Sequence, residues 1–148
     1  MRPILRVAGA FVVVACLAGC GGSGSGPLTA AQLATQGSAI CARAASEEKA
    51  LDVTSMAVAL PRLEAIGNRE NTDLSKLSAP ANEQASYHAL LSEASQVVSL
   101  LRSLESAIAG GGNPPPELLA RGRELTRRLA ALDGPLGMGV CSAAASPS

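Results

Sequence analysis

Residues 87–109, YHALLSEASQVVSLLRSLESAIA, carry the clearest structural pattern in the chain. Their apolar side chains recur at intervals of three and four, in the series Tyr87, Leu90, Ala94, Val97, Leu101, Leu104 and Ile108. This spacing places them on one face of an α-helix, and such a heptad-like stripe is typical of helices that pack at a shallow angle in bundles. Three glycines follow directly and should end the helix.

Two segments before this helix carry similar stripes. The first should begin near Ala30, because Thr29 and Gln32 have the spacing of a capping box, and only Glu48 interrupts its apolar face. The second contains Pro61, which should kink the helix or mark its first turn. The stripes are Leu33, Gly37, Ile40, Ala44, Glu48 and Leu51, then Met56, Leu60, Leu63, Ile66 or Gly67, Leu74 and Leu77.

A fourth helix is expected after the glycines, with Asn113 as its cap and Pro114 in its first turn. Its stripe is Leu118, Gly122, Leu125, Leu129 and Leu132, and Gly134-Pro135 should stop it. Four helices with short connections predict an all-α fold: a single up-down-up-down four-helix bundle followed by an extended C-terminal tail. We expect the bundle domain to span residues 29–141 and residues 142–148 to be disordered.

The composition argues against several functional classes. The chain has 12 basic and 12 acidic residues, and two of the basic ones, Arg2 and Arg6, lie in the N-terminal segment described next. The remainder therefore carries a small excess of negative charge, whereas binding of a nucleic-acid backbone requires clustered cations, so no nucleic-acid partner is expected. Tyr87 is the only aromatic residue outside that segment, which disfavours sites that stack bases, sugars or flavins.

The N-terminus is typical of an exported protein. A short cationic start precedes residues 7–19, which carry no charge and would span about 20 Å as a helix, short of the ~30 Å hydrocarbon core of a membrane. This run ends Leu17-Ala18-Gly19-Cys20, which resembles the lipobox of bacterial lipoproteins. The resemblance implies that residues 1–19 are a signal peptide and that Cys20 is the lipidated residue. The alternative is an ordinary signal peptide with a chance cysteine.

A lipid on Cys20 would anchor the protein to the extracytoplasmic face of the cell membrane, since two or three acyl chains hold firmly. The Gly- and Ser-rich residues 20–28 would then be a flexible tether. Of the other cysteines, Cys16 leaves with the signal peptide. Cys41 and Cys141 remain as a pair in an oxidising compartment, where a disulfide is the default. The tail after the fourth helix is long enough to run back along the first helix and bring Cys141 to Cys41.

Three short motifs resemble a group of uncharacterised, secreted or lipid-anchored helical proteins of actinobacteria. They are Ile40-Cys41-Ala42-Arg43-Ala44, Tyr87-His88-Ala89-Leu90-Leu91 and Leu136-Gly137-Met138-Gly139-Val140-Cys141. The resemblance covers residues 29–141. It implies the same pairing of Cys41 with Cys141, and it brings no activity with it.

The inventory of catalytic and metal-binding groups is thin. His88 is the only histidine, and no motif brings a serine and an acid to it, so we expect an exposed helix residue and no catalytic residues. The sequence has no zinc-binding or di-iron motif. Met56 or Met138 could ligate haem together with His88, but we expect the methionines to lie in the core. We therefore expect no metal and no cofactor. Charged clusters are expected to be solvated faces: Glu47, Glu48 and Asp52, and Arg121, Arg123, Arg127 and Arg128.

Two functional hypotheses follow, and neither is an enzyme. In the first, the bundle is an interaction or structural module of the cell envelope, held at the membrane by its lipid and bound to another envelope protein. In the second, the protein binds a small apolar molecule between helices lined by alanine and leucine. An apolar cavity of about 300 Å³ or more would favour the second.

The Cys20→Ala substitution tests the anchor. Without a thiol at position 20 no acyl chain is attached, so the protein should move from the membrane fraction to the soluble fraction. Fractionation followed by immunoblotting checks this. Continued association of the variant with membranes would contradict the lipoprotein assignment.

Overall fold

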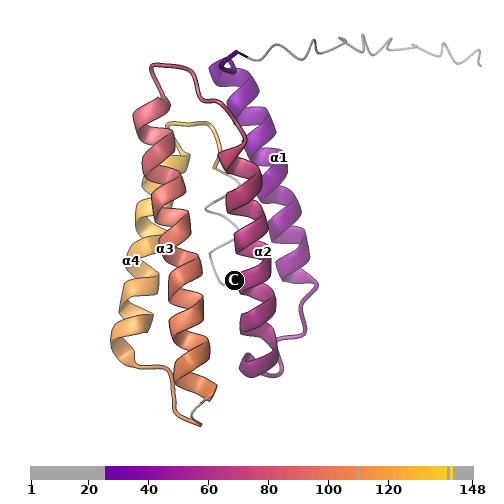
Figure 1. Cartoon of the computed structure of the whole chain (residues 1–148), viewed down its shortest axis with the longest axis vertical. Coiled ribbons are helices and arrows are strands. Elements are labelled where there is room, and N and C mark those ends of the chain that lie inside the picture. Colours follow the sequence, from indigo (N-terminus) through magenta and orange to yellow (C-terminus); the bar gives the residue numbers. More distant parts are fainter. Residues whose placement is uncertain (1–25, 110, 140, 142–148) are drawn as a thin grey trace, which may run out of the picture.

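The computed structural model describes residues 26–109, 111–139 and 141. Cys20, the predicted signal peptide, most of the predicted tether and residues 142–148 lie outside the described part. The described chain forms four helices (Figure 1): α1 (Ala30–Lys49), α2 (Met56–Ser75), α3 (Gln84–Ala109) and α4 (Pro116–Asp133). The prediction of a small all-α four-helix bundle is confirmed.

The ends of the helices follow local sequence chemistry. Thr29 caps α1 through the expected capping box, in which its hydroxyl accepts from the backbone N–H of Gln32 and the Gln32 side chain accepts from the backbone N–H of Thr29. Helix α2 runs without interruption through Pro61. The predicted cap of α4 is wrong: Pro115 is the N-cap instead of Asn113. The residue before a proline is driven out of the helical region, so the helix cannot begin before Pro116, the last of three successive prolines.

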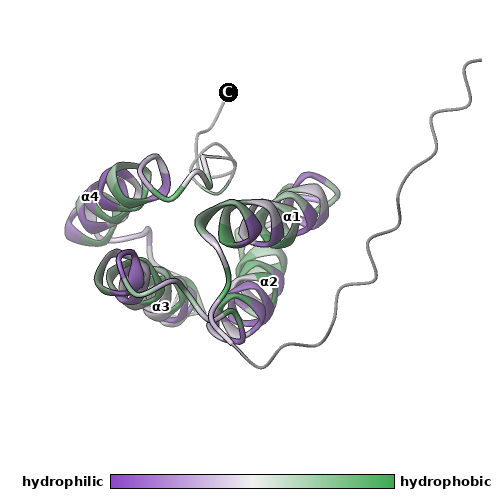
Figure 2. Cartoon of the chain, turned by 90° about the horizontal axis from the view of Figure 1, so that it is seen from above, coloured by the Kyte–Doolittle hydropathy of each residue, from purple (hydrophilic) through white to green (hydrophobic). Residues whose placement is uncertain are grey.

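Consecutive helices pack against each other, but α1 and α4 do not. Helix pairs α1–α2, α2–α3 and α3–α4 are in contact, whereas no residue of α1 has its Cα within 8 Å of a Cα in α4. Figure 2 shows the consequence: seen from above, α1 and α4 stand apart, and the chain that follows α4 passes between them. The bundle is therefore closed on its fourth side by the C-terminal segment, residues 134–141, and not by helix–helix packing.

The C-terminal segment packs along α1, with Gly137 next to Ala34 and Met138 next to Gly37. A Cβ on Gly137 would lie 3.1 Å from the Cβ of Ala34, and a Cβ on Gly37 would collide with the terminal methyl of Met138, so the missing side chain at Gly37 makes room for Met138. Met138 is completely buried. The segment is wound into turns, with Gly137 at a φ of 68°, where the sequence predicted an extended tail. Turns suffice because the span along α1 from position 34 to position 41 is only about 10 Å.

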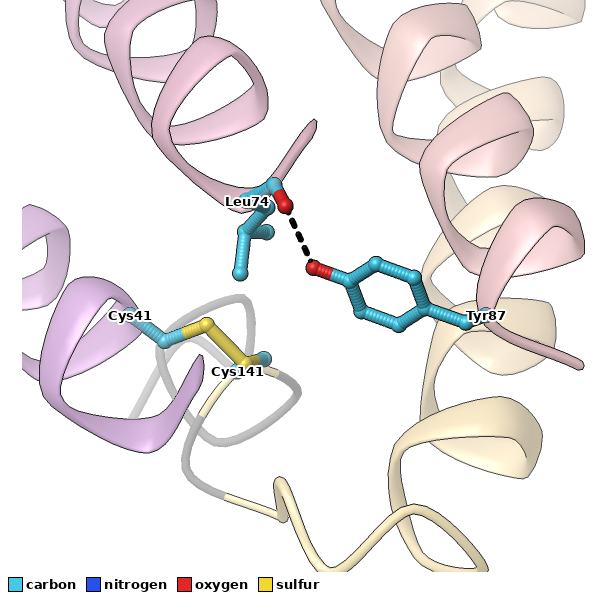
Figure 3. Close-up of a disulfide and its surroundings, with 4 residues drawn as sticks. All are labelled: Cys41, Leu74, Tyr87 and Cys141. Atoms are coloured by element: carbon cyan, nitrogen blue, oxygen red, sulfur yellow. Dashed lines mark hydrogen bonds between the residues drawn. A yellow bond between two sulfur atoms is a disulfide. The ribbon is translucent and has the colours of Figure 1, made fainter. Parts of the chain in front are cut away.

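The disulfide between Cys41 and Cys141 is confirmed (Figure 3). The two residues are 100 positions apart in sequence, and their Cα atoms lie 4.9 Å apart. Cys41 is fully buried. The bond lies in the main core, which also contains Tyr87. The Tyr87 hydroxyl donates to the backbone carbonyl of Leu74 at 2.6 Å, and this hydrogen bond joins the start of α3 to the end of α2. Burial raises the pKa of Tyr87 to about 12, so it remains a donor.

None of the four described helices combines the length and the apolar character needed to cross a membrane.

At the N-terminal end, the backbone N–H of Leu28 donates to the carbonyl of Ser78 at 2.7 Å, and the Leu28 side chain packs on the core. The ordered body of the described chain therefore begins at Leu28, one residue before the predicted domain boundary.

The Cys41→Ser variant tests the closure of the bundle. In the chain-entropy model, a bond that closes a loop of about 100 residues contributes about 4–5 kcal/mol, so the melting temperature measured by circular dichroism should fall by several degrees or more. Cys141→Ser and the double variant should lose the same amount, because each removes the same bond. Unchanged melting, or additive losses in the double variant, would contradict this role.

Candidate ligand-binding cavity

A cavity of about 350 Å³ lies inside the bundle, beside the disulfide. All four helices contribute to its wall, together with the C-terminal segment. The lining residues are Ala44, Glu48, Leu63, Gly67, Glu70, Ala94, Val97, Val98, Leu101, Leu129 and Cys141. Most of this surface is apolar.

The cavity exists because of two features of the packing. First, α1 and α4 are too far apart to interdigitate, and among the described residues only the segment after α4, with Cys141 bonded to Cys41, lies between them. Second, the helices present small residues to the interior at Ala44, Gly67 and Ala94. Larger side chains at these positions would fill the space, as close-packed cores normally do.

Two carboxylates face this apolar space: Glu48 from α1 and Glu70 from α2. The lining residues include no lysine, arginine or histidine. Burial raises the pKa of Glu48. A charged group in an apolar cavity is costly unless an opposite charge accompanies it.

Glu70 is the more strongly perturbed of the two. Its pKa is raised from 4.5 to about 7. Burial is the largest cause, repulsion from Glu48 and Asp133 contributes in the same direction, and attraction to Arg43 lowers the pKa. Arg43 does not neutralise Glu70, because its guanidinium pairs with Asp73 at 2.5 Å. Glu70 thus titrates near neutral pH, which is a common property of groups in functional sites.

Glu70 also lies beside the disulfide. One of its carboxylate oxygens and the sulfurs of Cys41 and Cys141 are all within 4.8 Å of one another. Three such atoms would suit a thiolate-binding metal. In the disulfide-bonded protein neither sulfur is a thiolate, so this group does not provide a metal-ligand set.

The other residues considered from the sequence are dispersed. His88 is exposed on α3, Met138 is core and Met56 is half exposed. The acidic cluster predicted as one solvated face divides three ways: Glu47 pairs with Arg69, Asp52 accepts from the backbone N–H of Thr54, and Glu48 faces the cavity. In the arginine cluster, Arg127 and Arg128 both pair with Glu124 on the exposed face of α4.

The sequence analysis did not identify Glu70 as a site residue, although the spacing of the apolar stripe in α2 includes its position. The stripe of α2 reads Leu63, Gly67, Glu70, Leu74 at spacings of four, three and four, so Glu70 occupies a position that faces the core. Glu48 interrupts the stripe of α1 in the same way. Two acids on the inner faces of neighbouring helices predict a shared polar site, and that inference requires the helix register, which the structure supplies.

Comparison with known proteins gives no relative: no protein-family model, no curated protein and no solved structure matches this chain.

The pH dependence of the Glu70→Gln variant tests the burial of this carboxyl. A raised folded-state pKa means that the folded protein holds a proton that the unfolded chain has released, so stability is fully present below about pH 4.5 and is lost as the pH rises to about 7. The amide of the variant stays neutral throughout. The free energy of unfolding of the variant, relative to the unaltered protein, should therefore rise by about 1–3 kcal/mol between about pH 4 and about pH 8.

Urea denaturation at a series of pH values measures this difference. The exposed Glu117→Gln is the matched control, and its difference from the unaltered protein should change little over the same range. A flat difference for Glu70→Gln as well would show that Glu70 is solvated.

Proposed function

We propose that this chain is a lipid-anchored, extracytoplasmic protein that binds a small apolar molecule between its helices. The observation that supports binding is the partly open, mostly apolar cavity of about 350 Å³ to which all four helices contribute. The anchor is proposed from the Leu17-Ala18-Gly19-Cys20 motif and the uncharged run before it.

The size and lining of the cavity suit this role. Small-molecule sites have volumes of roughly 300–1,000 Å³ and are mostly apolar with a few polar groups, and this cavity lies at the lower end of that range with two carboxyls. Each 100 Å² of apolar ligand surface removed from water contributes about 2.5 kcal/mol. Burial of a compact hydrocarbon in this cavity therefore provides favourable binding free energy without a large conformational change in the protein.

A membrane anchor is consistent with an apolar ligand. Such molecules partition into lipid, and a tether of about eight residues would keep the bundle within roughly 15 Å of the surface where they concentrate. The bundle itself need not enter the membrane.

A second candidate is the interaction module of the cell envelope. It is favoured by three exposed apolar residues, Val53 in the connection between α1 and α2 and Met56 and Val58 in the first turn of α2. Replacing all three by serine should abolish co-purification of a specific membrane partner. If nothing specific co-purifies with the unaltered protein, this candidate fails.

Filling the cavity tests the ligand-binding proposal. Ala94 lines the cavity from α3, and a leucine there would occupy part of the space. The full-length protein in nanodiscs should bind 1-adamantanol, a compact neutral cage alcohol, in isothermal titration calorimetry. Ala94→Leu should weaken that binding by about tenfold or more.

Ala89→Leu, on the exposed side of the same helix, is the matched control and should bind as the unaltered protein does. Empty nanodiscs account for partitioning into lipid. Equal affinity in Ala94→Leu, or no heat of binding beyond that of empty nanodiscs, would contradict the proposal.

A further inference from the structure

The charge around the cavity is one-sided. The two ionisable groups that line it, Glu48 and Glu70, are both acids that face the space from different helices. A third acid, Asp133 at the end of α4, is buried and close enough to repel Glu70. The wall formed by α3 is entirely apolar, with Ala94, Val97 and Leu101 among its residues.

The nearest base does not cancel this charge. Arg43 on α1 is the cation that acts on Glu70, but its guanidinium is bound to Asp73, and its side chain is 55% exposed. The two sulfurs beside Glu70 are joined in the disulfide and are not metal ligands. In the described part of the chain, Glu70 makes no ion pair. Arg43 and Arg69 share a small hollow with Glu70, but they are paired with Asp73 and Glu47. An ionised Glu70 is therefore a carboxylate at the wall of an apolar cavity whose lining contains no cation.

A ligand can supply the missing cation. A molecule with a compact apolar body and a protonated amine would bury the body against α3 and place the ammonium beside Glu70, with Glu48 nearby. A charge-assisted hydrogen bond of this kind is stronger than a neutral one, and in an apolar site it is poorly screened. A carboxylate or phosphate on the same body would be repelled by the same acids.

We propose that the ligand of this cavity is a lipophilic amine whose ammonium group pairs with Glu70. This inference rests on the proposed function, since it specifies the chemistry of the molecule that the cavity binds. It assigns Glu70 as the residue that selects the ligand's charge, and the apolar wall as the part that selects its shape.

Protonation of Glu70 gives the proposal a second signature. The group faces Glu48 and Arg43 from α1 and Asp133 from the end of α4, and α3 presents no charge to it in the cavity. With a pKa of about 7, Glu70 is largely neutral below that pH, and an ammonium ligand must then displace its proton. Amine affinity should therefore fall as the pH is lowered from about 8 to about 5, while the affinity for a neutral ligand should change little.

Three molecules with one hydrocarbon cage test the proposal: 1-aminoadamantane, 1-adamantanol and adamantane-1-carboxylate. Each is titrated into the full-length protein in nanodiscs at about pH 8, with empty nanodiscs as the blank. The amine should bind about tenfold or more tighter than the alcohol, and the carboxylate more weakly than the alcohol. Glu70→Gln should remove the advantage of the amine over the alcohol and the pH dependence of amine binding, and the exposed Glu117→Gln should change neither.

The outcomes separate this inference from the proposed function. If the alcohol binds as tightly as the amine, or Glu70→Gln leaves the amine's advantage unchanged, the cavity binds apolar molecules but Glu70 does not select an amine. If the carboxylate binds most tightly, the charge preference is the reverse of the one proposed. If none of the three binds, both the inference and the proposed function fail.

Discussion

The C-terminal segment is attached to α1 by burial of Met138 and by the Cys41–Cys141 bond, and this attachment closes the bundle. Helices α1 and α4 do not touch, so the bundle would be open along one side if the chain ended at Asp133. Two interactions close it: Met138 fills the space left by Gly37, and Cys141 is bonded to Cys41. The first supplies burial, and the second removes conformational freedom from the unfolded chain. Because α1 and α4 are not in contact, these two interactions are what join the first helix to the end of the described chain.

This mode of closure also explains the cavity. The segment packs on α1 near Ala34 and Gly37 and is bonded to it at Cys41, and small residues line the cavity beside this bond. Glu70 also lies beside this bond, with the disulfide sulfurs on one side and the apolar space on the other. Its raised pKa follows from burial and from the neighbouring acids. The bond that closes the bundle thus also forms part of the wall of the proposed binding cavity.

Much of the fold can be predicted from sequence, and little of the site can. Apolar stripes, the capping box at Thr29 and the glycines after α3 are local signals, and they locate the four helices. The Cys41–Cys141 pair follows from cysteine counting and from the reach of the tail. The predicted start of α4 is wrong because the effect of each proline on the residue before it outweighs the capping preference of Asn113. The cavity is a property of side-chain volume between non-adjacent helices, and no periodicity in one helix reveals it.

The proposed binding of an apolar cation in the cavity can be measured on the protein as it is isolated from cells, from the mass of the complex. Full-length protein extracted into nanodiscs with its native lipids, without added ligand, is examined by native mass spectrometry and then denatured to release bound molecules. We expect one small molecule with a basic nitrogen per chain, which dissociates when the solution is acidified. A ligand-free mass throughout, or a retained molecule that is anionic, would contradict it.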